Sequence, residues 1–468
     1  MIKGKNSVLA VLDVGSAKTC CIIATTDSAG DRLRVIGVGH QESRGIRYGK
    51  IVDMEQAQSS IGHAVQSAEQ AANVTLQGLY LSFSGIQLTS QLVGGSMVLP
   101  EGEVRAEDLA RLLHRVSIQE EFAPNHQASN HHDHYHGDSR SDVRGDPREP
   151  RVEARGDSRN DHRPDLRGEM LHLIPLGYAV DELDDVTDPL GMVGHQLSAR
   201  YHRVETSGTV LQNLLHAVGR CHMDVLGVIA APYAAGLACL VDDERSLGAT
   251  VIDLGAGTTS FACFQNGHLT HADRLLVGGY HITHDVAHGL SVSLQHAERL
   301  KNLYAHVLPA RGDDRDTIAV PLVGEVEGQS NNMIPRFALN NIVRPRVEET
   351  LELLRDKLNA LPQEIQQATW RLVLTGGASQ LPGLRELATH MLGRPVRLGV
   401  VHGWSSQPES ASTPSFAVAT GMLHYVMDHA LESSWAESYQ HRAGSRTTNG
   451  GGVGGFFRQG INWLKENF

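Results

Sequence analysis

Apolar residues recur along this chain in short runs that alternate with amphipathic stretches. Runs at 8–14, 19–25 and 33–40 predict three strands, and residues 54–73 carry apolar side chains at helical spacing, which predicts a helix. The alternation continues to about residue 428, and it predicts further strands and helices at 78–84, 205–220, 225–230, 250–264, 281–303, 340–360, 372–375, 382–392 and 416–427. Alternating strands and helices with many glycine turns indicate an α/β fold.

Two of these segments are nearly the same, although they lie about half a chain apart. Residues 11–19 have the sequence Val-Leu-Asp-Val-Gly-Ser-Ala-Lys-Thr, and residues 251–259 have Val-Ile-Asp-Leu-Gly-Ala-Gly-Thr-Thr. Such a turn presents backbone N–H groups and hydroxyls to a phosphate, and a carboxylate to Mg²⁺. One copy alone is more simply a tight hairpin. Two copies predict two related domains that close on one nucleotide.

The two turns supply most of the candidate site residues. Asp13 and Asp253 are expected to hold Mg²⁺, directly or through water, and Lys18 adds positive charge for the phosphates. The turn glycines can approach phosphates closely because glycine has no Cβ. The nucleotide-binding residues expected in the turns are Asp13, Gly15, Ser16, Ala17, Lys18, Asp253, Gly255, Ala256, Gly257, Thr258 and Thr259.

Later segments add further candidates to the nucleotide site. Glu298 and Lys301 lie one helical turn apart, where they could hydrogen-bond a ribose or purine, or form only a solvated ion pair. A Gly-Gly pair ends the predicted strand 372–375, and the carboxyl ends of strands are where α/β sheets admit ligands. The candidates added here are Gly278, Gly279, Glu298, Lys301, Gly376, Gly377 and Ala378.

Composition narrows the class of protein. The chain has 468 residues, enough for two or more domains, and its 41% hydrophobic and 20% charged residues fit a soluble globular protein. Its formal charge of −12 argues against general nucleic-acid binding. Its five cysteines form no C-x-x-C pair and are expected to be buried, reduced thiols of a cytosolic protein. No apolar run reaches the roughly 18 residues that a membrane span requires.

Residues 124–168 break the pattern because they contain almost no large apolar side chains. An acid-x-Arg-x unit repeats from Asp138 to Arg167, and a period of four would place like charges beside one another on a helix. We therefore expect a disordered loop with balanced charge. A histidine cluster precedes the repeat and is more simply a set of surface side chains than a metal site; it contains His131, His132, His134 and His136.

The C-terminal part separates into a linker and an amphipathic segment. Residues 429–455 are expected to be a flexible linker, rich in Gly, Ser and Thr from 441 onward. Residues 456–468 gather apolar side chains on one helical face, which favours a helix lying in a membrane interface. A helix docked on the protein's own core and a helix in a partner's groove are the alternatives. The expected membrane contacts are Phe456, Phe457, Arg458, Ile461, Trp463, Leu464, Lys465 and Phe468.

The order of the motifs resembles that of the actin, Hsp70 and sugar-kinase superfamily. That order is an Asp-Gly hairpin, a second Asp-Gly hairpin, an Ala-Glu-x-x-Lys helix and Leu-Thr-Gly-Gly. Within the superfamily, most of the chain resembles the family of the bacterial cell-division protein FtsA. The residues that carry this resemblance lie at 43–45, 49–53, 81–85, 172–175, 178–181, 376–378 and 419–425.

The resemblance implies an actin-like, ribonuclease H-like α/β fold with duplicated domains, an inserted α+β subdomain and a C-terminal amphipathic helix. The first core subdomain would comprise 1–84 and 204–246, and the second would comprise 247–279 and 347–428. The remaining parts would be the inserted subdomain 85–203, which contains the charged tract, an accessory subdomain 280–346, the linker 429–455 and the helix 456–468.

The resemblance also implies a function. It predicts a protein that binds ATP and Mg²⁺, polymerises with itself, and anchors FtsZ filaments and downstream division proteins at the cytoplasmic face of the inner membrane. One departure from ATPases of the superfamily is Ala230-Ala231-Pro232, where no side chain can orient an attacking water. We therefore expect slow hydrolysis at most. An actin-like pilus or secretion adaptor, or a sugar-kinase-type phosphotransferase, is the alternative.

Deleting residues 126–167 should leave the core folded, because this segment offers almost nothing to bury. We expect the midpoint of thermal unfolding of the deletion variant to lie within about 2 °C of that of the full chain. Circular dichroism during heating measures this midpoint. A large fall would show that the tract packs against the core.

Overall fold

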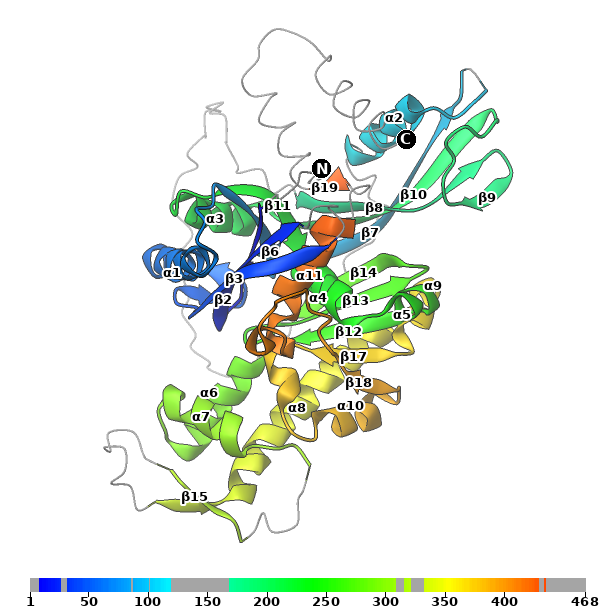
Figure 1. Cartoon of the computed structure of the whole chain (residues 1–468). Helices are drawn as coiled ribbons and strands as arrows, with labels where there is room; N and C mark the ends of the chain where they lie inside the picture. The colour runs from blue at the N-terminus through cyan, green and yellow to red at the C-terminus, as the bar shows by residue number, and fades with distance from the viewer. Residues whose placement is uncertain are drawn as a thin grey trace, which may run out of the picture.

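The structure, a computed structural model, describes residues 8–26, 32–85, 87–100, 102–118, 168–308, 315–320, 332–428 and 433–434. Two lobes, each built on a five-stranded sheet, lie one above the other in Figure 1. An inserted domain lies at the top of this view, and the helices α6 and α7 of the second lobe lie near the bottom.

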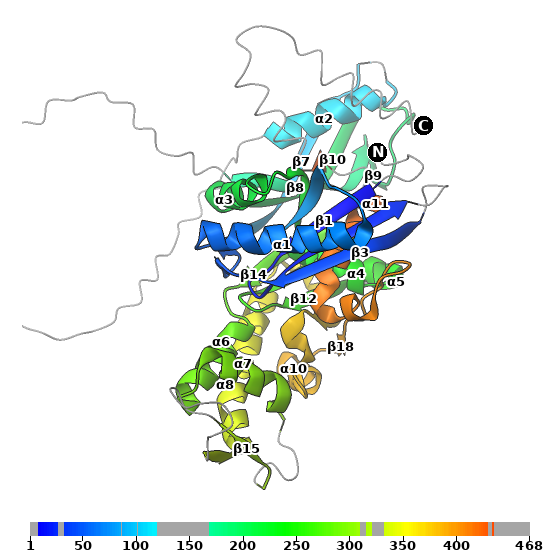
Figure 2. The same ribbon diagram turned by 60° about the vertical axis from the view of Figure 1, so that its left-hand side comes forward.

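The first lobe has a sheet of strand order β11-β6-β1-β2-β3. The first three strands along the chain are antiparallel neighbours, whereas β6 and β11 continue the sheet in parallel. The strands are β1 (Val8–Val14), β2 (Lys18–Thr26), β3 (Leu33–Glu42), β6 (Gly78–Phe83) and β11 (Asp224–Ala230). Helices α1 (Met54–Ala72) and α3 (Gly208–Gly219) accompany this sheet, and Figure 2 shows α1 lying along it.

Local sequence features explain the limits and the position of α1. The Asp53 carboxylate caps its start by accepting a hydrogen bond from the Gln56 N–H at 3.0 Å. Asn73 ends it in the left-handed conformation, with φ 53°. Gly39 of β3 lies under the helix, where a Cβ would come within 2.2 Å of the Ala64 carbonyl oxygen. Glycine at this position therefore lets the helix lie directly on the sheet.

The second lobe repeats the strand pattern of the first. Its sheet has the order β14-β13-β12-β17-β18, again with three antiparallel strands followed by two parallel ones. The strands are β12 (Ala249–Leu254), β13 (Thr259–Gln265), β14 (His268–Leu275), β17 (Leu372–Thr375) and β18 (Val396–Leu398). The duplication predicted from the two similar segments is therefore confirmed.

The helices of the second lobe differ from the prediction in one respect. The helical region expected at 281–303 is two helices, because Ser291 adopts a left-handed conformation and Ser293 caps a new start. The lobe's helices are α6 (Gly279–Leu290), α7 (Leu294–Tyr304), α8 (Arg336–Asn359), α9 (Gln363–Gln366) and α10 (Leu384–Leu392). A small hairpin of β15 (Thr317–Ala319) and β16 (Met333–Pro335) precedes α8.

The inserted domain forms a third sheet, which contacts both lobes. Its main strands have the order β19-β8-β10-β7, and β9 pairs with β8. The Ser90 hydroxyl of β7 lies 2.8 Å from both the N–H and the carbonyl oxygen of Ala272 in β14, so the domain caps the free edge of the second lobe's sheet. Its elements are β7 (Leu88–Val98), α2 (Ala106–Ile118), β8 (Gly168–Val180), β9 (Leu183–Val186), β10 (Gln196–Ser207) and β19 (Ser433–Ser434).

Two helices join the lobes at the centre of the molecule. Helix α4 (Ala231–Cys239) is buried along its whole length and packs against α11 (Ala417–Asp428). Gly421 makes this approach possible, because a Cβ there would lie 1.7 Å from the Ala234 carbonyl oxygen. The remaining short elements are β4 (Ile46–Arg47), β5 (Lys50–Ile51), α5 (Asp242–Leu247), η1 (Gln367–Thr369), η2 (Gly377–Gln380), η3 (Glu409–Ala411) and η4 (Pro414–Phe416).

Four expected boundaries fall inside elements. Those at 246/247 and 279/280 each separate one terminal residue from α5 or α6. The boundary at 203/204 falls inside β10, and the boundary at 346/347 falls inside α8, because neither strand nor helix shows a change of pattern there. The expected linker 429–455 contains β19, which pairs with β8. The charged tract up to 167 and the amphipathic segment 456–468 lie outside the described residues. Among the helices that the structure describes, none has the length and apolarity that crossing a membrane requires.

Candidate functional site

The two glycine turns close in the same way. The Gly15 N–H donates to the Lys18 carbonyl, and the Gly255 N–H donates to the Thr258 carbonyl, both at 3.0 Å. A Cβ on either glycine would lie 2.9 Å from the carbonyl oxygen that its turn closes on. The sequence duplication is thus also a duplication of backbone geometry.

The two turns meet between the lobes. A Cβ on Gly257 would lie 2.6 Å from the Ser16 hydroxyl oxygen and 3.0 Å from Cα of Tyr48. The Tyr280 hydroxyl of α6 donates to the Ser16 carbonyl at 3.2 Å. The predicted site residues of the first turn therefore lie directly against those of the second.

Asp13 and Asp253 bring two carboxylates to this junction. Asp13 is 8% exposed, and its Oδ1 accepts a hydrogen bond from the Ser82 hydroxyl at 2.7 Å. Burial raises the pKa of Asp13, against the lowering effects of Ser82 and Lys18. Burial and then the nearby Asp13 carboxylate raise the pKa of Asp253 to about 7, with Lys18 again opposing. Ionising both carboxyl groups therefore costs free energy unless a cation in addition to Lys18 lies beside them.

Gly376 shapes the wall beside Asp253. Its φ of 86° lies in the left-handed region, and a Cβ there would come within 2.3 Å of Asp253 Oδ1. Glycine is therefore required for the strand end of β17 to approach the carboxylate. The Leu-Thr-Gly-Gly segment therefore lies directly beside the second turn.

Lys18 is held by residues that the sequence did not single out. Its Nζ donates to the Ser415 carbonyl at 2.6 Å and lies 3.0 Å from the centroid of the Phe416 ring. Burial lowers the pKa of Lys18, although Asp13 and Asp253 favour its charged form. Ser82, Ser415 and Phe416 were not predicted as site residues. A serine at a strand end and a short helical turn carry no motif that indicates chemistry.

The predicted Glu298–Lys301 pair forms an i, i+3 ion pair in which the lysine is buried and the Glu298 side chain is 39% exposed. Lys301 is 9% exposed, and its Nζ lies 2.7 Å from Glu298 Oε2, 3.2 Å from the Gly279 carbonyl and 3.0 Å from the Thr283 hydroxyl. A Cβ on Gly279 would lie 3.6 Å from the Ala378 Cβ. The pair therefore supports the start of α6 beside the Gly-Gly-Ala segment.

The start of α6 is bonded to the second turn. The Gly279 N–H donates to the Gly255 carbonyl at 2.9 Å, and the Tyr280 N–H donates to the Ala256 carbonyl at 2.7 Å. Gly278 fits closely between them, since a Cβ there would lie 2.7 Å from the Gly255 carbonyl oxygen. The Thr259 hydroxyl donates to the Val277 carbonyl at 2.8 Å, so it too supports this loop.

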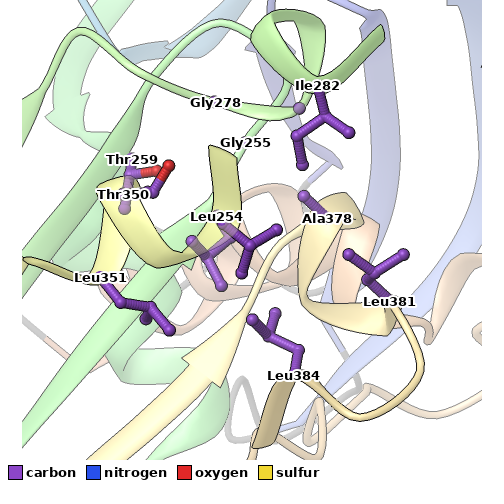
Figure 3. A pocket seen from close by; sticks show the side chains of 12 residues that line it. Leu254, Gly255, Thr259, Gly278, Ile282, Thr350, Leu351, Ala378, Leu381 and Leu384 are labelled. Atoms are coloured by element: carbon purple, nitrogen blue, oxygen red, sulfur yellow. The ribbon is translucent and has the colours of Figure 1, made fainter. Parts of the chain in front are cut away.

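A small cavity lies behind the second turn, in the second lobe (Figure 3). Figure 3 shows Ile282, Ala378 and Leu384 around it, and Gly255 and Gly278 at its rim. None of its lining residues is charged. The charged side chains of the two turns, those of Asp13, Lys18 and Asp253, are not among its lining residues.

The donor set at the junction fits a divalent cation with oxygen ligands. Among the described residues no cluster of three or more His, Cys, Asp or Glu could hold a metal by itself. Asp13 and Asp253 supply two carboxylates, and Mg²⁺ commonly takes one or two carboxylates together with water and phosphate oxygens. Gly376 keeps the space beside Asp253 free of a Cβ.

Two family profiles match this chain. The profile described as "Cell division protein FtsA" covers residues 250–421, from the second hairpin into α11. The profile described as "SHS2 domain inserted in FTSA" covers residues 161–205, which include β8, β9 and most of β10.

Relatives named cell division protein FtsA match nearly the whole chain. The protein of Rhizobium meliloti (strain 1021) is 36% identical over 482 residues, which cover 99% of this chain and 96% of that protein. The protein of Escherichia coli (strain K12) is 27% identical over 475 residues, which cover both chains completely.

Solved structures share the fold. A chain of a PilM-PilN type IV pilus biogenesis complex superposes with a TM-score of 0.55 at 15% identity, covering 90% of this chain and 98% of that one. MreB 5 of Spiroplasma citri bound to AMPPNP gives a TM-score of 0.50 at 11% identity, covering 94% and 99%. These likenesses concern the fold alone. The actin-like α/β fold with an inserted subdomain, predicted from the order of motifs, is confirmed.

Replacing Asp253 with Asn should stabilise the nucleotide-free protein at high pH. The folded protein holds the Asp253 proton up to about pH 7, whereas the ordinary carboxyl pKa is 3.8. The free energy of unfolding therefore falls between these values as pH rises. After allowance for the part of the carboxyl that water reaches, we expect Asp253→Asn to gain about 1–2 kcal/mol near pH 8.

Thermal melts of the wild type and Asp253→Asn near pH 8 and near pH 4.5 measure this difference, without added nucleotide or Mg²⁺. The advantage of the variant should shrink toward the lower pH. Asp184→Asn, at an exposed position in the inserted domain, is the matched control and should change little. An equal gain at both pH values would contradict the explanation.

Proposed function

Because this chain belongs to the family of cell division protein FtsA, we propose that it binds ATP with Mg²⁺ between its lobes and anchors FtsZ filaments to the membrane. The observation that carries the nucleotide part is the meeting of the two glycine turns, with Asp13 and Asp253 beside Lys18. FtsZ, a second copy of this chain, downstream division proteins and the lipids of the inner membrane are the partners.

The charges support a bound metal–nucleotide complex. When ionised, the Asp13 and Asp253 carboxylates and the Lys18 ammonium group together carry a net negative charge at a site that burial shields from water. Mg²⁺ would compensate Asp13 and Asp253, and Lys18 would bind a phosphate oxygen with an N–H that its Ser415 contact does not use. Backbone N–H groups of the two turns would complete the phosphate site. Glu298, Lys301 and the segment 376–378 would border the nucleoside side.

We propose that ATP acts mainly as a structural ligand. The residues that begin α4, Ala231 and Pro232, are buried and have apolar side chains. The Ala230 N–H just before them donates to His172 Nε2 at 3.0 Å. No side chain among these three can position a water for attack on a phosphate, which is a large part of phosphoryl-transfer catalysis. Hydrolysis would accordingly be slow, and binding would instead favour the closed arrangement of the lobes.

The membrane part of the proposal rests on residues 456–468. Their apolar stripe with flanking Arg458 and Lys465 suits the interface of a bilayer on its cytoplasmic face. One such segment would bind reversibly. A polymer that carries many copies would bind far more tightly through avidity, without any new contact.

Binding of a fluorescent ATP analogue with Mg²⁺ tests the nucleotide site. Asp253→Ala and Lys18→Ala should each weaken binding by about 10-fold or more, because each removes a charge that balances the metal or phosphates. Asp184→Ala should bind like the wild type. A wild type that shows no saturable binding, or variants that bind equally well, would refute the nucleotide site.

Truncation after Gly455 tests the membrane part. The truncated chain should lose sedimentation with vesicles that contain anionic lipid, because it lacks the whole apolar stripe. Trp463→Ala should lose part of the binding, and Asn462→Ala, outside the stripe, should retain it. Recruitment of FtsZ polymer to the vesicles should disappear with the same truncation. Unchanged sedimentation of the truncated chain would disprove a membrane role for residues 456–468.

A further inference from the structure

A short hairpin of the first lobe extends to the second lobe and contacts it. It comprises residues 46–51, with β4 and β5 as its arms and Tyr48 and Gly49 at its tip. We propose that this hairpin, called the clasp below, retains the nucleotide, and that separation of Tyr48 from the second lobe limits nucleotide exchange. The inference rests on the proposed nucleotide site and concerns the rate of release.

The tip of the clasp is a two-residue hairpin turn. Tyr48 has φ 52° and Gly49 has φ 72°, and a type I′ turn requires positive φ at both of its central residues. Positive φ is uncommon for a bulky residue such as Tyr48. Gly49 also lies close to the first lobe, because a Cβ there would lie 2.2 Å from the Ser84 carbonyl oxygen.

The base of the clasp is anchored in the first lobe. Ile46 is 4% exposed and belongs to that lobe's core. The Val52 and Asp53 N–H groups donate to the Gly45 carbonyl at 2.8 and 3.1 Å. Because Asp53 also caps α1, the clasp is an extension of a rigid part of the lobe.

The tip contacts the second turn through its backbone. A Cβ on Gly257 would lie 3.0 Å from both the N and the Cα of Tyr48. The adjacent Gly49 N–H donates to the Ser16 hydroxyl at 3.2 Å, which ties the clasp to the first turn as well. One loop therefore touches both of the turns proposed to hold the phosphates.

The Tyr48 side chain adds a second contact, to α6. Its ring centroid lies 5.4 Å from that of His281, with an angle of 45° between the planes. His281 is held in place because its Nδ1 accepts a hydrogen bond from the Gly278 N–H at 3.2 Å. The same start of α6 is bonded to Gly255. The tyrosine therefore packs on the part of the second lobe that is hydrogen-bonded to its glycine turn.

A consequence follows for nucleotide exchange. The clasp contacts join the lobes directly beside the phosphate turns, so the lobes cannot separate there while Tyr48 stays on Gly257 and His281. A ligand bound between the turns leaves along this side only after the contact opens. Removing the tyrosine ring should speed release by about 5- to 10-fold, the factor expected for losing one aromatic contact of this kind.

Release of a fluorescent ATP analogue, chased with excess MgATP in a stopped-flow instrument, tests this inference on the full chain. Tyr48→Ala and His281→Ala should both release the analogue faster, and Tyr48→Phe should behave like the wild type because it keeps the ring. The double variant should be no faster than the faster single variant, since both remove the same contact. Tyr304→Ala, an exposed tyrosine of α7, is the matched control.

Hydrogen exchange of the amides in residues 46–51, without nucleotide, gives a second readout that is independent of binding. Exchange should rise in Tyr48→Ala and His281→Ala but not in Tyr304→Ala. Unchanged release and unchanged exchange in Tyr48→Ala would overturn the clasp. A wild type that binds no analogue would instead refute the nucleotide site, and the exchange experiment would still decide whether the clasp contact holds.

Discussion

The two carboxylates of Asp13 and Asp253, brought together where water is scarce, constrain the rest of this structure. Each is the penultimate residue of the first strand of a duplicated hairpin, so the fold itself places two like charges close together. Burial and mutual repulsion raise the pKa of Asp253 to about 7, and Lys18 offsets only part of the charge. This imbalance is the electrostatic reason to propose Mg²⁺ there, since a divalent ion compensates both groups at once.

Holding these groups together requires that the lobes keep their relative position, and contacts far from the carboxylates contribute to this. The inserted domain leaves the first lobe after β6, yet its Ser90 caps the edge of β14 in the second. Helix α11 packs against α4 through Gly421, and the segment before it holds Lys18 through Ser415. Any movement of one lobe relative to the other must therefore change the contacts between the two turns, the contacts of the inserted domain with β14, and the contacts of α11.

Much of this arrangement was predictable from the sequence, because its main signals are local. Strand-turn-strand segments with Asp and Gly predicted the duplicated hairpins, and apolar periodicity predicted α1, α8 and α11. The sequence did not reveal the contacts of Lys18 with Phe416 or of Tyr48 with His281, since these join residues hundreds of positions apart that carry no motif. The break at Ser291 was missed because serine disfavours a helix too weakly to mark an end.

The contacts between the lobes suggest how a bound nucleotide could favour the closed arrangement of the lobes without being hydrolysed rapidly. Lys18 and the clasp both extend from the first lobe, and their partners Ser415, Gly257 and His281 lie on elements that follow α4. A ligand that bridges the two turns would add its own contacts to those of Lys18 and the clasp. It would favour the closed arrangement of the lobes by as much as its affinity for the closed arrangement exceeds its affinity for the open one. In the proposed function, the apolar start of α4 is the reason to expect slow hydrolysis. If the chain assembles on a membrane as proposed, a slowly released ligand would keep each subunit in its closed arrangement, because the lobes would have to separate before the ligand leaves.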